Sequence, residues 1–359
     1  MMGGAGVVRP QSVLLDTNAW ITDRLLRTAH GSALLYAIKR SGMKLALPEV
    51  VEGELAANTI DAANVAIDSI NKGFRCIQSI IGSYKAYKLP TEAEISAAIG
   101  SRLLQLDPLL VRVPFTIEHA KSALRRVNEQ RAPSSMKRQQ FKDCAIWEGA
   151  LSLAKECDIH LVSNDGDFYK DKEKTSLDGT LLRECRDSGV TITPYSSIEQ
   201  CLQHLFKSVP ALDEAKIAQH IHESLANKVA DISARYDFKP ADLTHFQIHA
   251  FLTEDPDVVA VNYSLFLNAV DTGTAPDGTR QDPTVSLFGK CRYNLSHETV
   301  QENDLERSEC EWRDRAGNTQ KRGGFYVTGV IMAGTPTVPY RYETEIPRAG
   351  SWGQSLISD

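Results

Sequence analysis

The sequence predicts an α/β domain with a parallel sheet flanked by helices over residues 1–208, followed by a smaller α+β domain with a mostly antiparallel sheet over 209–359. Two patterns carry this prediction. In the first part, short apolar runs alternate with segments of helical periodicity, and such chains form parallel sheets covered on both faces. In the second part, alternating β-type segments follow one another with turn signals between them. The character of the sequence changes near Ser208-Val209-Pro210, where we place the boundary.

The elements of the first part follow from apolar periodicity and from the residues that interrupt it. Ser41-Gly42 ends the first long helix, and Pro90 separates two later helices because proline cannot continue a helix. The predicted strands are 12–16, 44–47, 160–163 and 190–193. The predicted helices are 21–40, 48–70, 71–87, 91–104, 117–129, 141–156 and 180–187.

The second part begins with an amphipathic helix predicted over residues 212–236. Segments rich in β-branched and aromatic residues come after it, and Asp277-Gly278 and Arg322-Gly323-Gly324 are among the turn signals that divide them. The predicted strands are 246–252, 258–270, 285–295, 325–333 and 338–346. We expect an antiparallel sheet with a helix beside it.

Composition restricts the class of protein. The chain has 359 residues, of which 42% are hydrophobic and 24% charged, so two domains can each bury a core. No apolar run approaches the roughly 20 residues of a membrane span, and the first ten residues lack a signal-peptide core. We therefore expect no membrane association and a cytoplasmic location. The seven cysteines include no CxxC pair, so we expect them to be reduced.

Charge is distributed unevenly between the two parts. Residues 1–208 carry 26 Lys and Arg against 24 Asp and Glu, whereas 209–359 carry 14 against 22. Taken as a whole, the acidic second part is a poor surface for nucleic acid. Its role could be substrate recognition, regulation or the binding of a protein partner, and homo-oligomerisation stays open.

Acidic residues stand at the ends of apolar runs in the first part. Asp16 ends the run Val13-Leu14-Leu15, and Asp165 follows Leu161-Val162. Both lie at the carboxyl ends of predicted parallel strands, where ligands bind in open α/β sheets. Converging carboxylates repel each other and are costly to bury, and a divalent metal ion relieves both costs. The pattern therefore predicts a metal site that could also be catalytic.

Four motifs contain these two acids and further Asp and Glu residues. They are Leu14-Leu15-Asp16-Thr17-Asn18, Pro48-Glu49-Val50-Val51-Glu52-Gly53-Glu54-Leu55, Phe141-Lys142-Asp143-Cys144-Ala145-Ile146-Trp147 and Val162-Ser163-Asn164-Asp165-Gly166-Asp167-Phe168. Each motif alone is weak, but their order, spacing and setting over roughly residues 10–200 resemble those of PIN-domain nucleases. The arrangement is closest to the subgroup with a helical insertion before the third motif.

The resemblance implies a set of site residues. Asp16, Glu54, Asp143 and Asp165 would be catalytic and would bind the metal ion, with Asp167 as an outer ligand or a ligand of a second ion. Asn18, Ser163 and Asn164 would support them by orienting carboxylates or water.

Glu52 is the alternative to Glu54 in the second motif. Side chains two positions apart on a helix point roughly 200° apart, so one of the two can face the site. We prefer Glu54, because Leu55 follows it as in the family pattern.

The resemblance and the carboxylates together predict an endoribonuclease that depends on Mg²⁺ or Mn²⁺. Magnesium prefers oxygen ligands and keeps several waters. A metal-bound water loses its proton readily and can attack a phosphodiester, and a second ion about 4 Å away can stabilise the leaving oxygen. The choice of RNA over DNA rests on the resemblance alone.

A basic stretch leads into the third motif. Arg131, Lys137, Arg138 and Lys142 could hold a nucleic-acid backbone beside the acids. The alternative is a solvated basic loop, because Ala132-Pro133-Ser134-Ser135 is turn-like.

Two other functions compete with a nuclease. The fold could serve as a catalytically inactive binding or assembly module. A haloacid-dehalogenase-like phosphatase also begins with an Asp at a strand end. That chemistry needs a second Asp two residues later, where this chain has Asn18, so we rank it lower.

Overall fold

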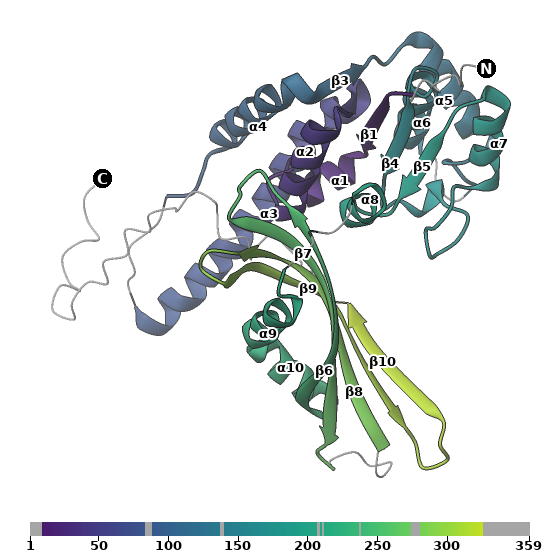
Figure 1. The fold of residues 1–359 in the computed structure, drawn as a ribbon. Helices are drawn as coiled ribbons and strands as arrows, with labels where there is room; N and C mark the ends of the chain where they lie inside the picture. Colours follow the sequence, from purple (N-terminus) through teal and green to yellow (C-terminus); the bar gives the residue numbers. More distant parts are fainter. Residues whose placement is uncertain are drawn as a thin grey trace, which may run out of the picture.

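The computed structural model describes residues 9–82, 88–136, 140–206, 209, 212–236, 238–273 and 281–325. The described chain contains a five-stranded parallel sheet with flanking helices and a second domain built on a five-stranded antiparallel sheet (Figure 1). The predicted fold class is confirmed. The predicted boundary at 208/209 stays a prediction, because residues 207–208 and 210–211 lie outside the described ranges.

The parallel sheet has the strand order β3-β2-β1-β4-β5. The strands are β1 (Gln11–Leu15), β2 (Lys44–Pro48), β3 (Leu110–Val113), β4 (Asp158–Val162) and β5 (Ile192–Tyr195). The chain moves outward in one direction from β1 to β3 and in the other direction from β4 to β5. The reversal lies between β1 and β4, and open α/β sheets bind ligands at the carboxyl ends of the strands at such a point.

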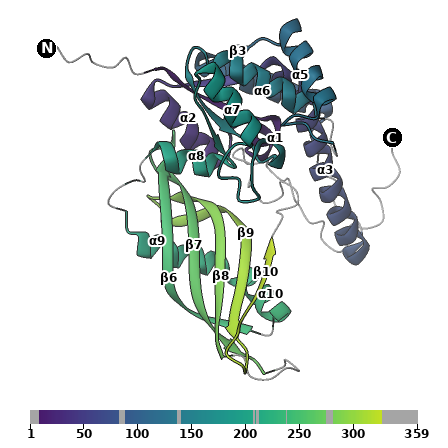
Figure 2. The ribbon, with the colours of Figure 1, turned by 90° about the vertical axis from the view of Figure 1, so that its right-hand side faces the viewer.

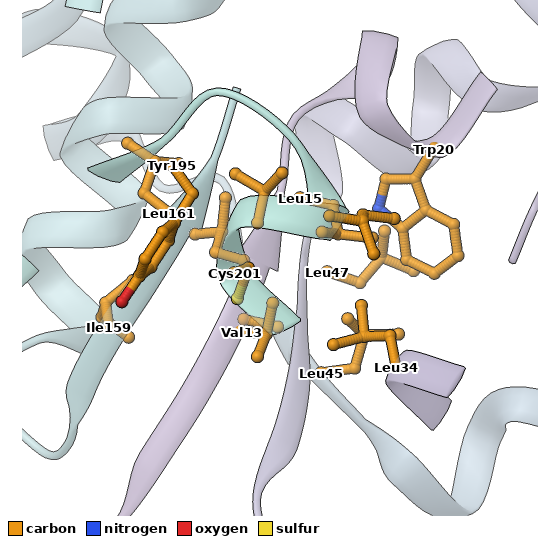
Figure 3. Packing of buried hydrophobic residues seen from close by; sticks show 14 of the residues in the cluster. Val13, Leu15, Trp20, Leu34, Leu45, Leu47, Ile159, Leu161, Tyr195 and Cys201 are labelled. Carbon is orange, nitrogen blue, oxygen red and sulfur yellow. The ribbon is translucent and has the colours of Figure 1, made fainter. Parts of the chain in front are cut away.

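Helices cover both faces of this sheet (Figures 1 and 3). They are α1 (Thr17–Thr22), α2 (Ala29–Ser41), α3 (Glu49–Ile81), α4 (Glu92–Leu106), α5 (Ile117–Glu129), α6 (Phe141–Leu153), α7 (Gly179–Ser188) and α8 (Ile198–Leu205). Alternate strand residues such as Val13 and Leu45 point toward Leu34 of α2 and Cys201 of α8, and all four are fully buried (Figure 3). This core fixes the strand ends that carry the acids.

Helix α3 extends well beyond the sheet (Figure 1). Its 33 residues span about 50 Å at 1.5 Å per residue. Val51 and Leu55, near its start, are buried, whereas Ile77 and Ile80 are exposed. No helix in the described part of the chain is both long and apolar enough to cross a membrane.

The structure corrects several element predictions. The helix predicted at 21–40 is divided into α1 and α2, because Arg24, Leu25 and Leu26 have positive φ angles of 52°, 56° and 59° that no α-helix accommodates. The break predicted at residue 70 is wrong, since α3 continues to Ile81 without a proline to stop it. Strand β3, helix α8 and the short 3₁₀ helices Asp107–Leu109 and Gly166–Phe168 were not predicted.

The described residues of the second domain form two helices and an antiparallel meander in the order β10-β9-β8-β7-β6. Its elements are α9 (Glu214–Ser224), α10 (Ala226–Tyr236), β6 (Phe238–Leu252), β7 (Val258–Asp271), β8 (Gln281–Asn294), β9 (Thr299–Arg313) and β10 (Thr319–Phe325). Helices α9 and α10 pack on one face of the sheet, over a core that includes Ile221, Leu265 and Trp312 (Figure 2).

The strand predictions for this domain were partly wrong. The single predicted helix is interrupted at Leu225, and β9 and most of β10 were missed. The strand predicted at 325–333 overlaps β10 at Phe325 alone; its other residues, and the strand predicted at 338–346, lie outside the described residues.

The two domains share a buried interface. Helix α2 packs against β6 and β7, and Phe251 and Ala260 of those strands belong to the core of the first domain. Across the interface, Nζ of Lys290 on β8 lies 2.6 Å from Oε1 of Glu199 on α8, and the two side chains are 21% and 14% exposed. Burial acts to raise the pKa of Glu199, but Lys290 and His30 hold it well below its ordinary value. The ion pair therefore stabilises the contact between the domains.

We expect Lys290→Met to destabilise the protein by about 3 kcal/mol, because it leaves the Glu199 carboxylate buried without its cation. Urea unfolding measures this loss. Lys216→Met is the matched control, since Lys216 pairs with Glu298 through side chains that are 44% and 49% exposed and solvent screens that pair. Equal losses in the two variants would contradict a role for the interface ion pair.

Candidate active site

Asp16 stands at the junction of β1 and α1. The buried strand β1 delivers it to the sheet edge, where its backbone N–H donates to the carbonyl of Val162 on β4 at 3.0 Å. Its side chain is 3% exposed and caps α1: Oδ1 accepts from the N–H of Ala19 at 2.6 Å, and Oδ2 accepts from the Ser163 hydroxyl. Burial nevertheless raises the pKa of Asp16, and Asp165 adds to the rise.

Glu54 projects from the first turns of α3 toward Asp16. One of its oxygens accepts from Oγ1 of Thr17 at 2.8 Å, and the other forms an ion pair with Lys142. Glu52 points elsewhere and pairs with Arg112 of β3, with 3.3 Å between Nε and Oε2. The structure therefore brings Glu54, and not Glu52, to the site.

Asp143 lies in the first turn of α6, where burial raises its pKa to about 7 from an ordinary 3.8. Four other carboxylates add to the rise by like-charge repulsion, in the order Asp165, Asp16, Glu54 and Asp167. Acids from four separate motifs therefore share one region of negative potential. That convergence is the central geometric feature of the site.

Asp165 and Asp167 lie in the turn after β4. Oδ1 of Asp165 accepts from the N–H of Asp167 at 2.9 Å, and the Ser163 hydroxyl accepts from the N–H of Asp165 at 3.1 Å. Gln140, just before α6, donates to Asp167. Ser163 thus connects Asp16 to the turn that carries the other two acids.

The remaining predicted supporting residues lie at the rim. Asn18 is exposed on α1, and Asn164 is exposed and accepts from Lys174. Lys174 also acts to lower the pKa of Asp16, so its charge reaches the acids.

The predicted basic residues are placed differently from one another. Lys142 is exposed beside the site and pairs with Glu54. Arg131 contacts Glu184 of α7 and Glu129, and it lines a pocket of about 250 Å³ with Arg125. Lys137 and Arg138 lie outside the described residues.

Three contributors were missed from sequence. They are Thr17, which holds Glu54; Gln140, which holds Asp167; and Tyr169, whose hydroxyl donates to the carbonyl of Ser163 at 2.6 Å. Thr17 lies inside the first motif, so its position in the sequence could have identified it as a site residue. Gln140 and Tyr169 flank motifs and gave no signal of their own.

The donor set fits a hard divalent cation. All five acids offer oxygen, and the repulsion that raises the pKa of Asp143 is what a bound cation would relieve. In the described part of the chain, no three His, Cys, Asp or Glu side chains are arranged to hold a metal ion directly. The oxygens of Asp16 and Glu54 are turned toward protein donors instead. Magnesium keeps several waters, so a loose ring of carboxylates suits it.

We expect Asp143→Asn to be more stable than the parent protein at pH 8 in chelator, and to have a smaller advantage at pH 5. Because the pKa is about 7 in the folded state and 3.8 in the free residue, the carboxyl costs stability progressively as the pH rises from about 4 to about 7. The advantage at pH 8 should be about 2 kcal/mol, measured by urea unfolding. A gain of the same size at both pH values would contradict the assigned repulsion.

The comparisons with known proteins agree with this geometry. A family model described as the PIN domain matches residues 13–168, a range that contains all four motifs. Neither the curated proteins nor the solved structures yielded a match. PIN domains are generally metal-dependent nucleases that bind nucleic acid. The matched region, with its parallel sheet and flanking helices, identifies the N-terminal domain of this chain as a PIN domain.

Proposed function

We propose that this protein is an endoribonuclease that hydrolyses phosphodiester bonds with water activated by Mg²⁺ or Mn²⁺. The observation that carries the proposal is the convergence of Asp16, Glu54, Asp165 and Asp167 on Asp143, whose pKa they raise. Acids with only a local structural role would have no reason to converge from four motifs.

Asp16, Glu54, Asp143 and Asp165 would hold the ion, with Asp167 as an outer ligand. When bound, the ion supplies a more acidic water and a positive charge for the phosphoryl oxygens. The chain positions the ligands: Ser163 fixes Asp16 and the turn at Asp165, and Thr17 fixes Glu54.

Lys142, with Lys137 and Arg138, is proposed to hold the RNA backbone beside the acids. Lys142 is exposed and pairs with Glu54, so a substrate phosphate could replace Glu54 as the partner of its ammonium group. Arg131 is left out of this proposal, because Glu184 and Glu129 already bind its guanidinium group. RNA is preferred to DNA by the family resemblance.

A second candidate, an inactive module that binds RNA without cutting it, has one observation in its favour. The acids are satisfied by protein donors, including the ion pair between Lys142 and Glu54, without a metal ion. Metal-dependent cleavage separates the two functions, and release of phosphate from a small ester would indicate a phosphatase instead.

We expect Asp16→Asn to lower cleavage of single-stranded RNA roughly a hundredfold or more, because a ligand that is buried and fixed by Ser163 loses its charge. The asparagine oxygen can still accept from the N–H of Ala19, so the fold should persist. Gel-based cleavage assays with Mg²⁺, Mn²⁺ or chelator measure the effect.

Asp158→Asn is the matched control. Asp158 begins β4 at the opposite edge of the sheet and pairs with Arg9 at 3.5 Å, so its removal should leave cleavage unchanged. Full activity of Asp16→Asn, or activity of the parent in chelator, would refute the proposed ligand set.

A further inference from the structure

Four side chains form a row across the second domain's sheet. The ring of His245 on β6 lies 5.6 Å from that of Phe266 on β7, and Phe266 lies 6.1 Å from Phe288 on β8 at an angle of 89°. The guanidinium carbon of Arg307 on β9 lies 4.1 Å above the Phe288 ring. We call His245, Phe266, Phe288 and Arg307 the aromatic row. The ring spacings lie in the range of favourable aromatic contacts, and Arg307 adds a cation–π contact.

The aromatic row lies on the sheet face turned away from α9 and α10. Strand residues alternate in direction, and Leu265 and Leu287, the neighbours of these two phenylalanines, point into the core beneath those helices. The first domain covers this face at Phe251, Ala260 and Lys290, near one end of the sheet. Figure 2 shows the remainder of the face, with no described element in front of it.

The face lies close to the candidate active site. Helix α1 begins beside Asp16 and is about 9 Å long, since it has six residues. At its far end, Asp23 is close enough to Lys290 for that ammonium group to affect the pKa of Asp23. Phe288 lies two residues before Lys290 on β8, on the same face of the sheet and about 7 Å from it. The aromatic row therefore starts beside the interface that α1 reaches from Asp16.

The chemistry around the row favours a base-stacking ligand over an apolar protein surface. Polar side chains, Ser264, Ser286 and Gln247, lie between and beside the rings, so the apolar area is divided. Stacking on separate aromatic faces with hydrogen bonds between them is how sheets bind single-stranded nucleic acid. An obligate protein interface would present continuous apolar area.

Local charge permits such a ligand although the domain as a whole is acidic. Glu309, beside the row, is paired with both Arg307 at 3.2 Å and Lys321 at 2.7 Å. Arg313 lies further along β9 on the same face. Glu311 is exposed between Glu309 and Arg313 on this face and lies opposite Lys321 of β10. Arg307, Arg313 and Lys321 therefore stand beside two acids here, whereas residues 209–359 as a whole carry 14 Lys and Arg against 22 Asp and Glu.

We propose that the free face of the C-terminal sheet binds single-stranded RNA, with bases stacked on Phe266 and Phe288 and phosphate near Arg307, and so holds the substrate of the adjoining PIN domain. This inference rests on the proposed function for the identity of the ligand. It assigns the second domain the task of supplying affinity, while the carboxylates supply the reaction.

The test measures binding and not cleavage. The full chain carrying Asp16→Asn is titrated with a fluorescein-labelled oligouridine, and the anisotropy is followed with and without Phe288→Ser. We expect Phe288→Ser to weaken binding about tenfold, as the loss of one stacked base does. The slope of affinity against salt should not change, because no phosphate contact is removed.

Two further variants control the test. Tyr36→Ser removes a similar cation–π pair, formed with Arg40 on α2 at 5.6 Å, and should leave affinity unchanged. Ser264→Glu places a negative charge opposite Phe288 without removing an aromatic ring, and should also weaken binding about tenfold. This second variant decides the question if Phe288→Ser does not fold.

Several results would overturn the inference. The first is that the Asp16→Asn parent does not bind oligouridine. The second is that Ser264→Glu and folded Phe288→Ser bind it within twofold of the parent affinity. The third is that the parent is a dimer and these variants are monomers that keep their affinity for RNA. The last result would assign the face to a second copy of the chain. If the chain with Asp16 intact cleaves RNA but Phe288→Ser and Ser264→Glu leave the affinity unchanged, this inference alone is wrong. If these variants weaken binding but the chain with Asp16 intact does not cleave RNA, the proposed nuclease alone is wrong.

Discussion

Electrostatic repulsion among carboxylates at one edge of the parallel sheet is the constraint on which the rest of the structure depends. Asp16, Glu54, Asp143 and Asp165 come from different elements, and each is held by its own backbone geometry. Burial is the largest cause of the raised pKa of Asp143, and the like charges of the other acids add to it. The arrangement persists because burial of the core stabilises the fold by more than the charged acids destabilise it. It is useful because a bound cation removes the repulsion, and this relief adds to the free energy of cation binding.

The same strand ends determine how the domains are joined. Asp16 begins α1, and the residues that follow α1 enter the interface where Lys290 meets Glu199. The short helix therefore connects the carboxylate site to the antiparallel sheet.

Much of this architecture was predictable, for reasons that differ between elements. Apolar runs that end in acids predicted β1 and β4. The angle between helical positions allowed one of Glu52 and Glu54 to face the site, and the family pattern at Leu55 favoured Glu54. Strand β9 was missed because Thr299–Arg313 is rich in charged residues and a register shift near Leu305 interrupts its alternation. Contacts such as Gln140 with Asp167 depend on tertiary packing, which local patterns do not encode.

Net charge was the least informative property of the sequence, and the structure explains why. Five converging carboxylates repel phosphate groups, and two described cations beside them, Lys142 and Lys174, are bound to Glu54 and Asn164. Affinity for a polyanion therefore has to come from other surfaces. The acidic total of the second domain suggests that it is unsuitable, yet its free face combines paired acids, arginine and aromatic rings. The distribution of charge over individual faces, and not its sum, decides which domain can hold a nucleic acid.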